Sequence, residues 1–127
     1  MKQRSVLIVE DDEWLAEQFA RALKKENCQT AISLHTLSAI EMIDKAHPDV
    51  IILDLLLTGN TAFSLMHELQ TYDDTSKTPI IICSNLASEL TLENLKPYGV
   101  RRILDKALMK PTDLIAAVKS VLLCTNQ

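Results

Sequence analysis

The sequence lacks three features that would each point to a class of protein: an excess of positive charge, paired cysteines and a long hydrophobic run. Its 127 residues carry 13 basic and 17 acidic side chains, a formal net charge of −4. This charge gives no general attraction to nucleic acid or to an anionic membrane. No apolar stretch is long enough to span a bilayer, and the short apolar run near the N-terminus ends in acids, unlike a signal peptide. We therefore expect no direct contact with nucleic acid and no membrane association.

The cysteines are few and widely separated. Cys28, Cys83 and Cys124 are an odd number and show no CxxC spacing. Such cysteines are typical of reduced core residues in a cytoplasmic protein. A length of 127 residues suits one ordinary domain with a single core. We expect residues 1–127 to form a single domain.

Strand-like and helix-like segments alternate along the chain. Apolar runs rich in β-branched residues span 5–9, 28–33, 49–54, 79–84 and 100–104. Helical patterns occupy a first segment that ends near Asn27, followed by 36–46, 61–72, 88–97 and 111–124. Asn27 suits the left-handed cap of the first helix, and Pro111 suits the start of the last. Continuous apolar strands that alternate with helices predict an α/β fold whose parallel sheet is covered on both faces.

Polar side chains follow four of the five predicted strands. Glu10 and Asp11 end the first run, Asp54 ends the third, Ser84 ends the fourth, and Lys106 comes shortly after the fifth. The carboxyl ends of parallel strands meet at one edge of the sheet, where ligands bind. We therefore expect these side chains to converge.

Each of these residues also has a plain structural explanation. Asp11 or Asp12 could cap the first helix, Asp54 could cap a loop, Ser84 could lie in a turn, and Lys106 could be a solvated surface cation. Their coincidence favours a site, because three adjacent carboxylates repel one another unless a cation neutralises them. Carboxylate oxygens are ligands that suit Mg²⁺. A metal site would explain the acidic cluster.

The predicted site contains the groups required for phosphoryl transfer to a carboxylate, in which the protein mainly positions groups and neutralises charge. Asp54 would attack phosphorus and become an acyl phosphate. Mg²⁺ on Asp11, Asp54 and water would neutralise one phosphoryl oxygen, and Lys106 and Ser84 would neutralise the others.

Together these motifs resemble a response-regulator receiver domain of two-component signalling, in the CheY-like superfamily, from about Ser5 to Leu123. The segments "VLIVEDD" and "PDVIILDLLLTG" are similar to the acidic pair and the phosphoacceptor strand of that family. The segments "TPIIICSN" and "YGVRRILDK" are similar to its fourth and fifth strands. The resemblance implies a flavodoxin-like (βα)5 three-layer sandwich with a parallel five-stranded sheet of order 2-1-3-4-5.

The resemblance also assigns roles to individual residues. Asp54 would be the phosphoacceptor, with Ser84 and Lys106 beside it as catalytic groups. The metal ligands would be Glu10, Asp11, Asp54 and the backbone carbonyl of Leu56.

The function implied by the resemblance is Mg²⁺-dependent transfer of a phosphoryl group to Asp54 from a histidine kinase or a phosphotransfer protein. The change would switch binding to a downstream protein partner, or to an output domain outside this chain. Such a bacterial, cytoplasmic phosphoprotein is not an enzyme beyond its own phosphorylation and dephosphorylation. The resemblance leaves homodimer formation open.

Departures from the family pattern affect the expected signal. Ile103 occupies the position of the aromatic switch residue, so the usual coupling of Ser84 to an aromatic ring cannot operate unchanged. Ala107 replaces a proline that often follows a cis peptide, so we expect Lys106 to be aimed less rigidly. The resemblance also places Leu56 and Leu86 beside the path of the attacking water; both are apolar and cannot orient it, which predicts slow dephosphorylation.

Two other functions compete with this one. The first is a phosphorylation-independent, receiver-like interaction module; Ile103 favours it, whereas the intact Asp54, Ser84 and Lys106 oppose it. The second is a flavodoxin-like cofactor binder, which needs a loop of amide donors after the first strand to hold phosphate. The sequence "EDDE" at this position would repel an anion, so a cofactor binder is the least favoured of the three hypotheses.

Overall fold

In the computed structural model, the described residues are 3–54, 61–85 and 90–125. The elements, in chain order, are β1 (Arg4–Val9), α1 (Glu13–Lys25), β2 (Cys28–Ser33), α2 (Thr36–Ala46), β3 (Val50–Leu53), α3 (Thr61–Thr71), β4 (Ile80–Ser84), α4 (Leu92–Leu95), the 3-10 turn η2 (Lys96–Tyr98), β5 (Val100–Asp105) and α5 (Pro111–Thr125). The five strands pair in parallel in the order β2-β1-β3-β4-β5. The predicted fold class and strand order are confirmed.

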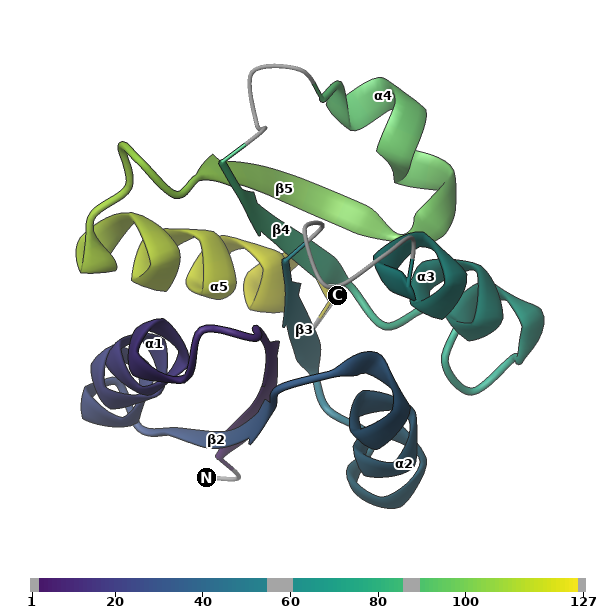
Figure 1. The fold of residues 1–127 in the computed structure, drawn as a ribbon, viewed down its shortest axis with the longest axis horizontal. Coiled ribbons are helices and arrows are strands. Elements are labelled where there is room, and N and C mark those ends of the chain that lie inside the picture. Colours follow the sequence, from purple (N-terminus) through teal and green to yellow (C-terminus); the bar gives the residue numbers. More distant parts are fainter. Residues whose placement is uncertain (1–2, 55–60, 86–89, 126–127) are drawn as a thin grey trace.

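Helices cover both faces of the sheet (Figure 1). One core cluster joins the sheet to α1 and α5, and the other joins it to α2, α3 and α4. Successive side chains of a strand point to opposite faces. In β1, Val6 and Ile8 therefore pack toward α1 and α5, whereas Leu7 and Val9 pack toward α2 and α3. This alternation also decides where the side chains just beyond each strand project.

The ends of α1 follow local signals in the sequence. The Asp12 carboxylate accepts a hydrogen bond from the backbone N–H of Leu15 at 3.1 Å and caps the helix. After the helix, Asn27 adopts a left-handed conformation with φ 64°. The left-handed turn predicted at Asn27 is therefore confirmed, since asparagine tolerates this region better than most residues.

The helix predicted at 88–97 is wrong in its extent. The α-helix α4 begins only at Leu92, because Thr91 caps it by accepting a hydrogen bond from Asn94 N–H at 3.3 Å. It gives way to the 3-10 turn η2 around Pro97, whose missing N–H cannot continue an α-helix. Residues 88 and 89 lie outside the described part. Among the described helices, none is long and apolar enough to cross a membrane.

Candidate functional site

The site lies at the carboxyl edge of the sheet, around the point where the strand order reverses between β1 and β3. Glu10, Asp54 and Lys106 each occupy the position one residue past the end of a strand. The residues two positions before them all pack toward α1 and α5: Ile8, Ile52 and Leu104. Because side chains alternate along a strand, the three charged side chains emerge on the same side of the sheet. The expected convergence of these residues is confirmed.

Lys106 joins the two buried carboxylates. Its Nζ lies 3.0 Å from Asp54 Oδ2 and also contacts Glu10 Oε1. The Lys106 side chain is 12% exposed, and those of Glu10 and Asp54 are 2% and 4% exposed. One oxygen from each of Glu10, Asp11 and Asp54 lies within 4.8 Å of the others. The edge of the sheet therefore holds three carboxylates around one ammonium group.

The three consecutive acids have different roles. Glu10 is buried and turns into the cluster, while Asp11 is exposed at its rim. Asp12 caps α1 through its side chain, and its backbone N–H donates to Glu10 Oε2 at 3.2 Å. The capping explanation is thus correct for Asp12 and does not account for Glu10. This backbone contact to Glu10 was not predicted, since nothing in the sequence distinguishes which acid turns inward.

Burial raises the pKa of Glu10 from 4.5 to about 7. Within this net value, the neighbouring Asp11 and Asp54 also act to raise the pKa, whereas the Lys106 ammonium and the Asp12 N–H act to lower it. Glu10 differs from Asp11 and Asp12 in being buried, and burial is the main cause of its raised pKa. Burial thus gives Glu10 a higher proton affinity than an exposed glutamate, despite its contact with the Lys106 ammonium.

Lys106 and Cys83 also respond to this environment. Burial by itself lowers the pKa of Lys106, but its contacts with Glu10 and Asp54 outweigh burial and raise that pKa above its ordinary value. Lys106 is therefore protonated and positively charged at neutral pH. Burial raises the pKa of the Cys83 thiol, on the neighbouring strand β4, to about 12. Cys83 is a neutral core residue below the charged cluster.

Ser84 is fully buried at the end of β4. Its backbone carbonyl accepts the Lys106 N–H at 3.1 Å, so the predicted hydroxyl residue and the lysine are neighbours through the backbone. By alternation its side chain belongs to the face that carries Ile80 and Ile82, on the side of α3 and α4.

The structure describes some of the residues that depart from the family pattern and not others. Lys106 contacts both buried carboxylates although Ala107 follows it, and no cis peptide occurs in the described ranges. Ile103 is partly buried against the cluster that includes α3 and α4. The predicted metal-binding carbonyl of Leu56, and Leu86 on the predicted water path, lie outside the described residues.

The carboxylate cluster fits a hard divalent cation. When all groups are ionised, three carboxylates and one ammonium leave two negative charges uncompensated. Oε1 of Glu10 is buried and meets Lys106 only as an ion pair, since no aligned hydrogen bond reaches it within the described residues. Oxygen-only ligands with this net charge suit Mg²⁺ better than softer metals.

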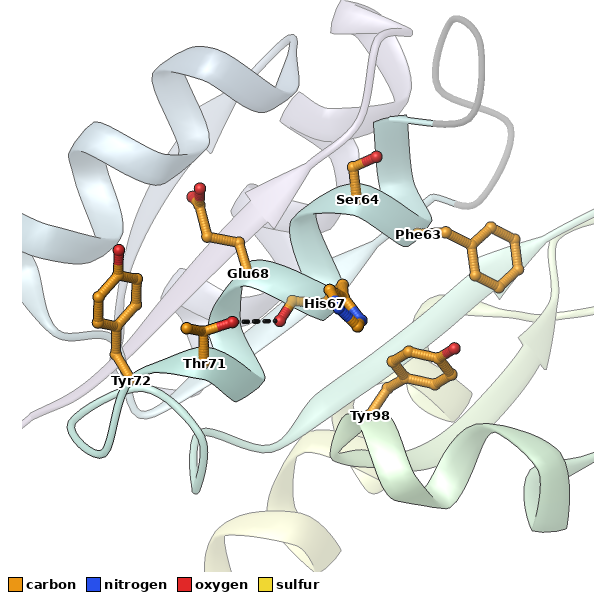
Figure 2. Close-up of a pocket in the computed structure, with 7 residues that line it drawn as sticks. All are labelled: Phe63, Ser64, His67, Glu68, Thr71, Tyr72 and Tyr98. Carbon is orange, nitrogen blue, oxygen red and sulfur yellow. Dashed lines mark hydrogen bonds between the residues drawn. The ribbon is translucent and has the colours of Figure 1, made fainter.

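A second hollow lies between α3 and η2 and shares no residue with the carboxylate cluster. Figure 2 shows its lining of seven residues, in which Phe63 and Tyr98 meet edge to face with ring centroids 6.4 Å apart. Within this lining, the His67 carbonyl accepts a hydrogen bond from the Thr71 hydroxyl at 3.1 Å. Among the described residues that line it, Glu68 is the only carboxylate. The hollow therefore lacks the paired acids and the cation that define the site at the sheet edge.

Comparison with known proteins gives a consistent result. Residues 6–119 match the family model described as the response regulator receiver domain. The sensory transduction protein RegX3 of Mycobacterium tuberculosis is 32% identical over 121 residues, which are 93% of this chain and 50% of RegX3. The regulatory protein VanR of Enterococcus faecium is 30% identical over 118 residues, which are 92% of this chain and 49% of VanR. The chain thus spans about half the length of these curated relatives.

Among solved structures, the receiver domain of the Francisella response regulator 1452 is similar. It superposes with a TM-score of 0.84 and is 26% identical, covering 97% of this chain and 99% of its own.

Proposed function

Because this chain belongs to the response regulator receiver domain family of two-component systems, we propose that Asp54 accepts a phosphoryl group from a histidine kinase or a phosphotransfer protein. The observation that carries the proposal is the contact of Lys106 with Asp54 beside the buried Glu10. A buried carboxylate that is held by a lysine, next to a cluster suited to a divalent cation, is equipped for phosphoryl transfer.

In the proposed reaction, a carboxylate oxygen of Asp54 attacks phosphorus in line with the leaving group. A P–O bond to Asp54 forms while the P–N bond of a phosphohistidine, or the P–O bond of an acyl phosphate donor, breaks. The leaving group takes the electron pair of that bond. The product is an aspartyl phosphate, which returns to aspartate when water attacks phosphorus.

The charged neighbours of Asp54 would stabilise this transfer. Lys106 keeps its ammonium at 3.0 Å from Asp54 Oδ2, where it lowers the repulsion that an incoming phosphoryl group meets. Ser84 supplies a hydroxyl donor from the end of β4. Mg²⁺ would be held by Glu10, Asp11 and Asp54, together with the carbonyl predicted at Leu56, and when bound it neutralises a phosphoryl oxygen as a Lewis acid.

The consequence of phosphorylation in this proposal is a change in the affinity for a downstream protein or an output domain. The protein is regulatory, and the only reaction proposed for it is the phosphorylation and dephosphorylation of its own aspartate. The proposal treats residues 1–127 as one receiver domain and keeps the cytoplasmic location expected from the sequence.

The test is intact mass spectrometry after incubation with acetyl phosphate, with and without Mg²⁺. We expect a phosphoryl adduct that requires Mg²⁺ in the wild type and is absent in Asp54→Asn. Asp73→Asn is the matched control, since Asp73 is an exposed aspartate in the loop between α3 and β4. An adduct that survives in Asp54→Asn, or a folded wild type that forms none, would contradict the proposal.

One observation favours a second candidate, a phosphorylation-independent interaction module. The position of the aromatic switch is filled by Ile103, which packs against the α3 and α4 side of the core instead of presenting an aromatic ring. A folded wild type that binds Mg²⁺ but forms no adduct would support this alternative.

A further inference from the structure

Lys106 has to bring its ammonium to carboxylates that follow two other strands, β1 and β3. A lysine side chain is a flexible chain with a point charge at its end. Its position is therefore set largely by the direction in which the backbone presents it. The backbone on both sides of Lys106 is held by specific hydrogen bonds.

Before the lysine, the sheet provides the restraint. The Lys106 N–H donates to the Ser84 carbonyl at 3.1 Å, which extends the pairing of β4 and β5 by one residue.

After the lysine, one residue accepts three successive backbone N–H groups. The Asp105 carboxylate oxygen Oδ1 accepts the Ala107 N–H at 2.9 Å. The Asp105 carbonyl accepts the N–H groups of Leu108 at 3.1 Å and Met109 at 2.9 Å. The turn that follows Lys106 is thus closed around Asp105, and the side-chain bond spans the lysine itself.

We propose that Asp105 is a positioning residue for Lys106. By binding the Ala107 N–H, its carboxylate fixes the turn that aims the lysine ammonium at Glu10 and Asp54. The bond depends on Ala107, because a proline at 107 would have no N–H to donate. The role in phosphoryl transfer rests on the proposed function, whereas the effect on the position of Lys106 does not.

The test compares Asp105→Ala with Asp105→Asn. An asparagine side-chain oxygen can still accept the Ala107 N–H, whereas alanine cannot. Asp113→Ala is the matched control: the Asp113 carboxylate also accepts a backbone N–H in the segment after β5, that of Lys110 at 2.8 Å, without spanning Lys106. All variants are compared with the wild type for folding by circular dichroism. Asp105→Glu, which keeps the charge and displaces the oxygen, replaces the alanine variant if that variant does not fold.

The first readout is the NMR signal of the Lys106 side-chain Cε and Nζ in the metal-free protein, which requires no phosphorylation. We expect Asp105→Ala to shift it and to broaden it, Asp105→Asn to restore it, and Asp113→Ala to leave it unchanged. A wild-type signal in Asp105→Ala, or equal shifts in the alanine variants at 105 and 113, would overturn the proposal. So would an asparagine variant that behaves like the alanine variant.

The second readout is the rate of phosphorylation by acetyl phosphate in the presence of Mg²⁺. We expect Asp105→Ala to slow it about tenfold, as for other residues that orient a group in a site, and Asp105→Asn to restore most of the rate. If the wild type forms no adduct, the proposed function fails, and the NMR comparison still decides the role of Asp105. If the wild type reacts and Asp105→Ala reacts equally fast, the positioning role is wrong.

Discussion

The Lys106 ammonium lies between two carboxylates that follow different strands: Nζ is 3.0 Å from Asp54 Oδ2 and contacts Glu10 Oε1. All three side chains are largely shielded from water. The cation therefore compensates charge that the solvent cannot screen, and its removal has consequences that an exposed ion pair would not have.

Replacing Lys106 with methionine should destabilise the metal-free protein by about 3 kcal/mol, because it leaves two buried carboxylates without their cation. Lys119→Met is the control, since its ion pair with Glu26 has a 60% exposed lysine and should cost less than about 1 kcal/mol. Urea denaturation measures both. We also expect Mg²⁺ to recover part of the loss in Lys106→Met. Equal losses of unfolding free energy in the two variants would show that the buried contacts of Lys106 stabilise the protein no more than the exposed ion pair does.

The stability of the metal-free protein should fall as pH rises from about 4.5 to about 7. Burial raises the pKa of Glu10 to about 7 in the folded state, so the folded state binds the proton more tightly than the unfolded state across this window. Over this window the ionisation of Glu10 therefore destabilises the fold by about 3 kcal/mol, since each unit of pKa difference corresponds to about 1.4 kcal/mol. Denaturation of the wild type and Glu10→Gln at several pH values tests this. In Glu10→Gln the unfolding free energy should depend less on pH, and at pH 8 this variant should be more stable than the wild type. If the unfolding free energies of the two proteins changed with pH in parallel, the prediction would be contradicted.

Mg²⁺ affinity should weaken as pH falls below about 7, since a proton on Glu10 competes with the metal. Competition by a single proton raises the Mg²⁺ dissociation constant by at most about tenfold for each unit that the pH falls. Trp14 offers a fluorescence readout, because it lies in the first turn of α1 near Asp11 and is 68% exposed. A calorimetric titration should give the same dependence. An affinity that is constant between pH 5 and 8 would exclude Glu10 as a ligand.

The neighbouring acids Asp11 and Asp12 should separate into two effects. Asp12→Ala removes the cap of α1 and should cost about 1 kcal/mol of stability, with Mg²⁺ affinity changed little. Asp11→Ala removes an exposed carboxylate from the cluster and should weaken Mg²⁺ binding while leaving the unfolding free energy of the metal-free protein unchanged or higher. Denaturation and metal titration on both variants provide the comparison. Reversed effects would mean that the roles of the two acids are exchanged.

Features that depend on neighbours along the chain follow from the order of residue types. The parallel sheet follows from apolar runs that alternate with helical patterns. The left-handed turn at Asn27 and the start of α5 at Pro111 follow from residue types with known backbone preferences. The convergence of Glu10, Asp54 and Lys106 followed from one rule, that parallel strands end at the same edge. The local rules failed for α4, where Thr91 and Pro97 leave only a short α-helix.

The interactions among the converging groups depend on how distant segments pack in three dimensions. Asp54 and Lys106 are separated by 52 positions in the sequence, and no local pattern fixes the distance between their side chains. Which acid of the triplet has its pKa raised depends on burial, and burial is set by packing from other elements. The bond between Asp105 and the Ala107 N–H is local, but its relevance to Lys106 appears only once β1 and β3 have brought their carboxylates within reach. Residue types thus placed the charges at one edge, and three-dimensional packing set their distances and their protonation.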